Sequence, residues 1–184
     1  MTQPESSDCD WGDIINAFPL KKLWVTHTLN LRPLTKQDSV ELGDFLSGDP
    51  EMTWTRKPWS RRNVDYLLSL RLSHYKQYGF GPYGIELDGK LIGMAGVQVW
   101  DYEPCSVEFL VYVAKSQWNQ GYGTNLTKWI IDKCNDIPSL PFLYAATRPE
   151  NTRINHIVKQ LGFMKTGNGE HYGYPSIYWK RACK

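Results

Sequence analysis

The stretch Trp118-Asn119-Gln120-Gly121-Tyr122-Gly123-Thr124 decides the fold of this 184-residue chain. An apolar run over 107–114 precedes it and predicts a buried strand. A helix is predicted after it, because apolar residues recur at helical spacing at Leu126, Trp129, Ile130 and Cys134. A strand that enters a glycine turn and then a helix presents free backbone N–H groups and the positive end of a helix dipole. The stretch is therefore a candidate site for an anion such as a diphosphate.

The two glycines do not fit the common nucleotide-binding motifs. A Walker loop needs Gly-Lys-Ser or Gly-Lys-Thr at the helix start, whereas Gly123 is followed by Thr124-Asn125. A dinucleotide fingerprint needs a third glycine and an acidic residue about 20 residues later at a strand end, and that context is missing. Gly-x-Gly also occurs in strand-to-helix turns that bind nothing, so its function depends on the neighbouring segments.

The composition is that of one globular domain without a strongly charged partner. Hydrophobic residues make up 41% and charged residues 22% of the chain, which are ordinary proportions. The net charge of +2 gives no reason to expect direct nucleic-acid binding. Residues 1–20 have a charge of −4, which leaves +6 on the rest of the chain. We expect an acidic, partly disordered N-terminal extension over 1–20 and one domain over 21–184.

The cysteines argue against a zinc or dithiol site. No two of the four cysteines form a CxxC pair, and both Cys105 and Cys134 lie in apolar patterns, so we expect these two to be buried thiols. No signal-peptide pattern and no apolar run of about 20 residues occurs. We therefore expect a cytoplasmic protein with no metal and no membrane contact.

The hydrophobic pattern predicts a mixed α/β sheet with helices packed over it. Helices are expected over 35–46, from Ser60 to Tyr75, and over 126–134 and 151–161, with a short turn at 11–18. Asp88-Gly89 predicts a hairpin between two strands. The expected strands cover 23–34, 83–87, 90–100, 107–114, 142–147, 163–166 and 176–181.

Taken together, several motifs resemble the GNAT superfamily of N-acetyltransferases. These are the strand VEFLVYV before WNQGYGT, and then PEN before a helix that ends in LGF. Trp118, Glu108 and the opening Leu31-Arg32-Pro33-Leu34 with Asp38 are similar to the branch that contains the ribosomal-protein N-terminal acetyltransferases. The resemblance covers residues 22–181. It implies a single-domain α+β fold with a mixed, mostly antiparallel sheet, flanking helices and a splayed pair of strands.

The resemblance also implies acetyl-coenzyme A as the acetyl donor. The N–H groups of the glycine turn would bind the pyrophosphate, and the exposed main chain of the preceding strand would bind the pantetheine arm and polarise the thioester carbonyl. The expected coenzyme-binding residues are Leu110, Val111, Tyr112, Val113, Trp118, Asn119, Gln120, Gly121, Tyr122, Gly123, Thr124, Asn151 and Asn155.

Two residues are candidates for the proton transfers. Glu108 lies on the strand that should pass beneath the acetyl group, and it is either the general base or the partner of an Arg or Lys in the sheet. Val158 stands where many family members have a tyrosine that protonates the leaving thiolate. Tyr112 is therefore the candidate acid, with Tyr172 and Tyr174 as alternatives.

The acceptor side is expected around residues 51–62, where aromatic and basic side chains alternate. Trp54, Trp59 and Tyr172 are the candidate acceptor-binding residues. Three functions remain open at this point. They are transfer to a protein or peptide α-amine, transfer to a small-molecule amine, and binding of acetyl-coenzyme A without turnover. A monomer or a homodimer is expected.

Overall fold

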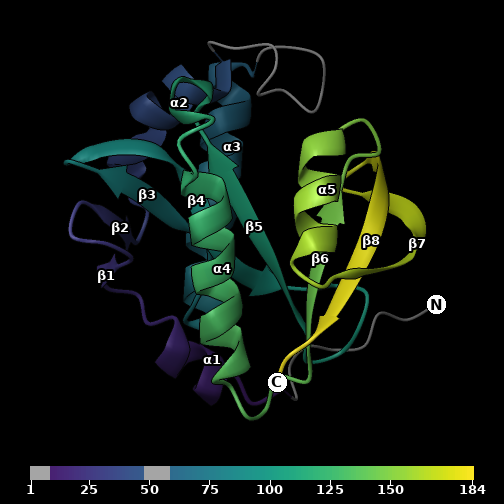
Figure 1. The fold of residues 1–184 in the computed structure, drawn as a ribbon. Helices are drawn as coiled ribbons and strands as arrows, with labels where there is room; N and C mark the ends of the chain where they lie inside the picture. Colours follow the sequence, from purple (N-terminus) through teal and green to yellow (C-terminus); the bar gives the residue numbers. More distant parts are fainter. Residues whose placement is uncertain (1–8, 48–58) are drawn as a thin grey trace.

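The computed structural model describes residues 9–47 and 59–184. Within these ranges eight strands form one sheet in the order β1-β2-β3-β4-β5-β6-β8-β7 (Figure 1). The strands are β1 (Leu23–Trp24), β2 (Leu29–Arg32), β3 (Tyr83–Leu87), β4 (Lys90–Val99), β5 (Val107–Val113), β6 (Phe142–Thr147), β7 (Met164–His171) and β8 (Tyr174–Ala182). The helices are α1 (Gly12–Ala17), α2 (Ser39–Ser47), α3 (Arg61–Tyr78), α4 (Tyr122–Asn135) and α5 (Thr152–Gln160).

The sheet is split between β5 and β6. Every other strand pair in the described part of the chain is antiparallel, whereas β5 and β6 run parallel and pair only at Val107–Leu143 and Glu108–Tyr144. Beyond that point the two strands diverge (Figure 1). The predicted mixed, mostly antiparallel sheet with a splayed strand pair is confirmed.

Two apolar layers hold the sheet, and β5 contributes to both. The main core contains Val107, Phe109 and Val113 of β5 together with α4 and α1. A second cluster contains Leu110 and, at its edge, Tyr112, packed with apolar residues of α2 and α3. The predicted alternation of β5 side chains is therefore confirmed, and it places α3 over the face that also carries the even-numbered residues of β5.

The N-terminal segment from Cys9 onward packs on the main core. Ile14 of α1 and Phe18 are 3% and 0% exposed and belong to that core. A domain boundary at residue 20 stays a prediction. No helix in residues 9–47 and 59–184 is long and apolar enough to cross a lipid bilayer.

Two predicted strand boundaries were wrong. The expected single strand over 23–34 is the hairpin β1–β2, in which Leu23 pairs with Leu31. The hydroxyl of Thr26 accepts a hydrogen bond from the Leu29 N–H at 3.0 Å, and this contact closes the turn that apolar alternation could not reveal. The last two strands are longer than predicted, because Tyr172 and Gly173 both have positive φ and form a two-residue hairpin turn.

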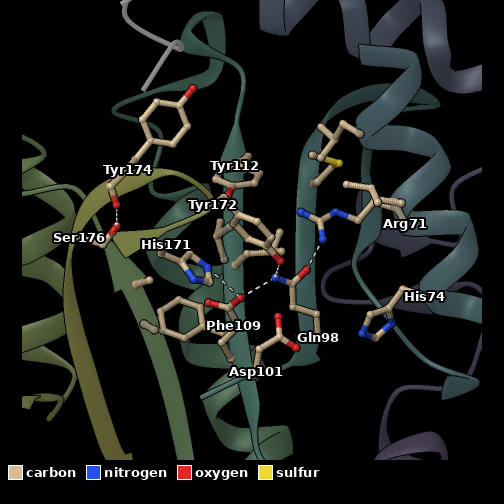
Figure 2. Close-up of a pocket in the computed structure, with 18 of the residues that line it drawn as sticks. Arg71, His74, Gln98, Asp101, Phe109, Tyr112, His171, Tyr172, Tyr174 and Ser176 are labelled. Atoms are coloured by element: carbon tan, nitrogen blue, oxygen red, sulfur yellow. Dashed lines mark hydrogen bonds and ion pairs between the residues drawn. The ribbon is translucent and has the colours of Figure 1, made fainter. Parts of the chain in front are cut away.

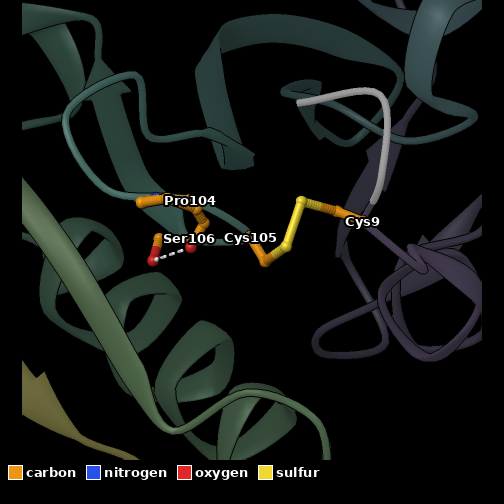
Figure 3. Close-up of a disulfide and its surroundings, with 4 residues drawn as sticks. All are labelled: Cys9, Pro104, Cys105 and Ser106. Carbon is orange, nitrogen blue, oxygen red and sulfur yellow. Dashed lines mark hydrogen bonds between the residues drawn. A yellow bond between two sulfur atoms is a disulfide. The ribbon is translucent and has the colours of Figure 1, made fainter. Parts of the chain in front are cut away.

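The prediction that Cys105 is a buried thiol was also wrong. Cys105 is exposed and forms a disulfide with Cys9, 96 residues away in the sequence, as Figure 3 shows. The bond ties the segment before α1 to the loop between β4 and β5. No spacing rule links two cysteines so far apart, so the sequence pattern held no sign of the pairing. Cys134 is free and buried as predicted, and burial raises the pKa of its thiol.

Loss of the disulfide should lower the stability of the fold. Closing a loop of this length restricts the unfolded chain, and such bonds contribute about 2–4 kcal/mol. We expect Cys105→Ser to lower Tm, and a reductant to lower the Tm of the unmodified protein to the same value without affecting the variant. Thiol titration of the unfolded, unreduced protein should find Cys134 and Cys183 alone. Four reactive thiols, or a reductant-insensitive Tm, would contradict this assignment.

His74 joins α3 to the sheet as a neutral imidazole. Its Nδ1 lies 2.9 Å from the carbonyl oxygen of Phe80, and its Nε2 accepts the Val99 N–H at 3.1 Å. These two contacts require a proton on Nδ1 and none on Nε2. A second proton would face the Val99 N–H, and burial lowers the pKa of His74 from 6.5 to about 4.

This arrangement makes stability depend on pH. Between pH 6.5 and about 4 the unfolded chain binds a proton at His74 that the folded protein does not bind. The free energy of unfolding should therefore have its full value above pH 6.5 and should decrease as the pH falls toward 4. The decrease should be about 3 kcal/mol at most. Urea unfolding at a series of pH values measures this loss. His74→Gln should give a flatter profile in that window, and parallel profiles would show that His74 does not titrate as described.

Candidate active site

A cavity of about 660 Å³ lies where β5 and β6 part, and it extends to α3. Its walls are formed by residues of α3, β4, β5 and β6 and of the β7–β8 hairpin. The volume is in the range of small-molecule and cofactor sites. The split in the sheet therefore leads into an open pocket rather than onto a flat surface.

The edge of β5 that faces the split carries unpaired main-chain groups. A Cβ atom on Gly93 of β4 would collide with the Tyr112 carbonyl oxygen, so that carbonyl points toward β4. Main-chain groups alternate along a strand, so the N–H and C=O of Val111 point toward the split instead. The pairing with β6 ends at Glu108, which leaves the Val111 groups available to a ligand.

The glycine turn follows directly and is anchored to the same strand. The indole N–H of Trp118 donates to the Val113 carbonyl at 2.7 Å. Asn119 and Gly121 have φ values of 65° and 82°, which bend the chain so that α4 begins at Tyr122. The main-chain N–H groups of residues 119–124 have no hydrogen-bond acceptor in the part of the chain that the structure describes. Successive free N–H groups at a helix start form an anion site.

Two predicted coenzyme residues lie on the opposite side of the split, at the start of α5. Asn151 lines the cavity, and its side chain caps α5 by accepting the Ile154 N–H at 3.2 Å. Asn155 holds the turn between β6 and α5, because its amide contacts the Thr147 hydroxyl and the Arg148 carbonyl. These contacts give Asn155 a structural role, and its contact with the coenzyme stays a prediction.

Glu108 is a buried carboxylate at the point where the strands part. Its side chain accepts a hydrogen bond from Gln98 Nε2 at 2.5 Å, and His171 Nε2 lies 3.2 Å away. Both contacts are to Oε1, and no described hydrogen bond reaches Oε2. Among the described residues, no Arg or Lys forms an ion pair with Glu108, so the alternative of such a partner finds no support there. Among the described residues, Glu108 is thus held through one carboxylate oxygen only.

Gln98 connects Glu108 to a buried cation on α3. Its amide oxygen accepts a hydrogen bond from Arg71 Nη1, while its amide nitrogen also donates to the Tyr172 hydroxyl at 3.0 Å. Figure 2 shows Gln98 between Arg71 and the β7–β8 hairpin, which carries His171 and Tyr172. The row Arg71–Gln98–Glu108 therefore crosses the cavity from α3 to β5.

The candidate acids differ in their surroundings. Burial raises the pKa of Tyr112 to about 12 and also raises the pKa of Tyr172. Tyr174 points away from the Glu108 group, and the Arg148 guanidinium lies 3.8 Å from the centre of its ring (Figure 2). Val158 lies in the main core with no exposed surface, so the family's usual acid has no counterpart at that position.

Part of the predicted acceptor side reaches the cavity. Trp59 and Tyr172 both line it. Trp54 lies outside the described residues, as do Arg56 and Lys57. Arg62 is exposed, and Arg61 lies 3.5 Å from Asp65 on the surface of α3, so these two do not line the cavity.

Three polar residues of the site, Gln98, Arg71 and His171, were not predicted from the sequence. Gln98 interrupts an apolar strand, Arg71 interrupts the apolar face of a helix, and His171 lies in a segment predicted as a loop. Gln98 and Arg71 could have been identified as candidates from the sequence, because a polar residue at a buried position needs a polar partner. Among the described residues, no group of three or more His, Cys, Asp or Glu could hold a metal ion.

Comparisons with known proteins match this geometry. A family model described as an acetyltransferase (GNAT) domain matches residues 28–164. RimL, a ribosomal L7/L12 α-N-protein acetyltransferase in complex with coenzyme A, is 14% identical with a TM-score of 0.70, covering 88% of this chain and 98% of that chain. Mycobacterium smegmatis RimJ in complex with CoA-disulfide is 20% identical with a TM-score of 0.67, covering 84% and 81%.

A third similar structure is the microcin C7 self-immunity acetyltransferase MccE in complex with acetyl-CoA and AMP. It is 13% identical with a TM-score of 0.72, covering 91% of this chain and 99% of that chain. At such identities these structures show a shared fold, whereas the family match extends over most of the chain. The chain therefore belongs to the GNAT acetyltransferase family, whose acetyl donor is acetyl-CoA.

Proposed function

We propose that this protein transfers an acetyl group from acetyl-CoA directly to a primary amine, with a protein or peptide N-terminal α-amine as the preferred acceptor. The observation that carries the proposal is the position of Glu108. This buried carboxylate lies at the last paired position of β5, beside the unpaired edge and on the wall of the cavity. A base is thus available where the split would receive the thioester.

The coenzyme would lie along the unpaired edge of β5. Pyrophosphate oxygens would accept hydrogen bonds from the N–H groups of residues 119–124, because these groups have no acceptor among residues 9–47 and 59–184. The pantetheine arm would follow the strand back from there. The main-chain groups of Val111 are those that face it, while Leu110 and Tyr112 contribute side chains to the acceptor face. A Val111 N–H aimed at the thioester oxygen would stabilise the developing oxyanion.

Glu108 would take the proton of the attacking amine. An α-amino group has a reference pKa of about 7.8 and a lysine side chain about 10.4, so an α-amine is the easier group to deprotonate. Oε2 is the atom of Glu108 that can accept the proton. His171, which contacts Oε1 and lines the cavity, would orient the carboxylate and pass the proton toward solvent.

Transfer would be direct. The amine nitrogen attacks the carbonyl carbon, the C–N bond forms, the C–S bond breaks, and the coenzyme leaves as a thiolate. Cys134 lies on α4 and is buried, and it therefore supports no acyl-enzyme route. Burial raises the pKa of Tyr112 to about 12, which makes it a weaker acid toward the leaving thiolate than an ordinary tyrosine. We therefore assign Tyr112 to the wall of the site and let the thiolate leave unassisted.

A small-molecule amine is the second candidate acceptor. The cavity of about 660 Å³ supports it, since a volume of this size accommodates a whole small molecule. Binding of acetyl-CoA without turnover is a third possibility, suggested by Val158 at the position of the usual acid. Glu108 with an open oxygen argues for turnover, because a binding module has no use for a buried carboxylate at the thioester.

We also propose a cytoplasmic monomer or homodimer that binds no nucleic acid. The use of acetyl-CoA supports this location. The Cys9–Cys105 disulfide argues against a cytoplasmic location, because the thiol pool of the cytosol keeps most protein cysteines reduced. Alkylation of intact cells before lysis, followed by mass spectrometry, reports the state of these cysteines. Light scattering reports the oligomeric state.

The glycine turn gives a prediction that separates binding from stability. The added methyl group of Gly123→Ala meets no protein atom in α4, so this variant should not lower Tm, while it should weaken acetyl-CoA binding about 10-fold by blocking close approach of the pyrophosphate. Gly121→Ala should weaken binding and also cost roughly 1–2 kcal/mol, because its φ of 82° is strained for alanine. Gly43→Ala in α2, also in open space, is the matched control. Calorimetric titration that finds wild-type affinity in both turn variants would remove the turn from the coenzyme site.

Glu108 gives the test of the proposed chemistry. Glu108→Gln keeps an oxygen for Gln98 but removes the base, so we expect kcat to fall by about 10²–10⁴-fold with the Kd for acetyl-CoA unchanged. Thiol release with a panel of peptides and amines measures this. Glu103→Gln, in the loop before β5, is the matched control and should keep wild-type kcat. Full activity of Glu108→Gln would exclude Glu108 as the base.

A further inference from the structure

We propose that the acceptor carries a carboxylate within a few bonds of its reactive amine, and that Arg71 binds this carboxylate. The inference rests on the proposed transfer to an amine and names the class of acceptor. Arg71 would then be the residue that determines acceptor specificity. The group that would bind the carboxylate is the Arg71 guanidinium, which lines the cavity beside Gln98.

The position of Arg71 in α3 is the first observation. The buried side chains of α3 are Val64, Leu68, Arg71 and Tyr75, which follow the spacing of one helix face. An apolar residue at the third position would complete this face at no electrostatic cost. The chain instead places a cation there, 7% exposed, and burial of a charge is unfavourable unless a partner compensates it.

The partner is missing from the described part of the protein. The contacts of Arg71 are the Gln98 carboxamide and the Tyr172 hydroxyl, and no described carboxylate forms an ion pair with it. Its Nε is a buried donor without an acceptor. The indole N–H of Trp59, which lines the same cavity, is another. Both unsatisfied donors line the same cavity, and the buried guanidinium of Arg71 calls for an oxygen-rich anionic group.

The opposite wall supplies the complementary charge. Gln98 donates to Glu108 at 2.5 Å and accepts from Arg71, so one carboxamide separates the cation from the carboxylate. A ligand with an amine and a carboxylate a few bonds apart matches this spacing. Its amine would face Oε2 of Glu108, and its carboxylate would face the Arg71 fork. An amine acceptor without a carboxylate would leave Arg71 buried without an ion-pair partner.

Two sources provide this chemistry. In a free amino acid the α-carboxylate lies two bonds beyond the amine nitrogen. In a peptide that begins with an acidic residue, the side-chain carboxylate lies one or two bonds further out. Both place an anion near the reactive amine, and both differ from their carboxamide counterparts only in charge. Paired acceptors therefore test the shared chemistry and identify the source.

The experiment compares kcat/KM within two matched pairs by thiol release and product mass spectrometry. One pair is a free amino acid and its amide, and the other is a tripeptide that begins with Asp and the same tripeptide beginning with Asn. We expect the wild-type protein to prefer the carboxylate in at least one pair by about 10-fold or more, as for a charge-assisted contact. Arg71→Met should reduce the preference to less than about 2-fold, and Arg71→Lys should keep part of it.

Arg62→Met is the matched control, because Arg62 lies exposed on the same helix, outside the cavity. This variant should keep the wild-type preference. Circular dichroism and acetyl-CoA affinity confirm that each variant is folded. Equal kcat/KM for both members of both pairs in the wild-type protein overturns the inference, and so does a preference that survives in Arg71→Met. Loss of the preference in Arg62→Met overturns it as well.

Failure of the proposed function has a different signature. In that case the wild-type protein binds acetyl-CoA but acetylates none of the four acceptors. The inference is then decided by binding alone, as the Tm shift that each acceptor produces in the presence of coenzyme A. A shift specific to the carboxylate and lost in Arg71→Met supports the acceptor site, whereas no carboxylate-specific shift overturns it.

Discussion

The parting of β5 and β6 is the constraint on which the rest of the structure depends. Two parallel strands that pair at only two positions leave main-chain groups on the edge of β5 without partners. A buried N–H or C=O without a partner costs roughly as much as a lost hydrogen bond. Such an edge, lining a pocket, is therefore a favourable place for a ligand that can pair with it. The neighbouring glycine turn, with free N–H groups of its own, extends the same edge to the start of α4.

The polar row across the cavity depends on this split. Glu108 is the last residue of β5 that pairs with β6, and Gln98 lies opposite it on β4. An alternating strand thus sends a carboxylate and a carboxamide to the face that α3 covers. Arg71 meets them from that helix, so sheet register and helix phase together place a cation, an amide and an acid in line. The chemistry of the site follows from the register of three elements rather than from a contiguous motif.

Local patterns were sufficient to predict most of the fold. The period of Val107–Val113 and the helix signal after Gly123 correctly placed β5 and α4, because both elements bury one clear face. The β1–β2 turn was missed because it depends on a threonine hydroxyl, and the length of the β7–β8 hairpin was missed because Tyr172 adopts a positive φ. The Cys9–Cys105 bond joins segments too far apart for any local rule.

The geometry of the glycine turn was predictable from the sequence, whereas the polar contacts around Glu108 were not. The glycine turn is contiguous in sequence, so its geometry follows from a few residues. The partners of Glu108 come from β4, the β7–β8 hairpin and, through Gln98, from α3, and only the folded chain brings them together. His171 was missed because its strand was predicted to end at residue 166, before this position. The side chain of Asn155 also holds the turn after β6, a role that the sequence pattern did not indicate, and its contact with the coenzyme stays a prediction.

The most direct test of this account is amide hydrogen exchange along β5, measured by NMR with and without coenzyme A. If the pantetheine arm lies on the unpaired edge, exchange of the Val111 amide should slow markedly on binding. The Tyr112 amide, which already faces β4, should change little and serves as the internal reference. Tight binding of coenzyme A with no added protection at Val111 would contradict the claim that the split between β5 and β6 is the coenzyme site.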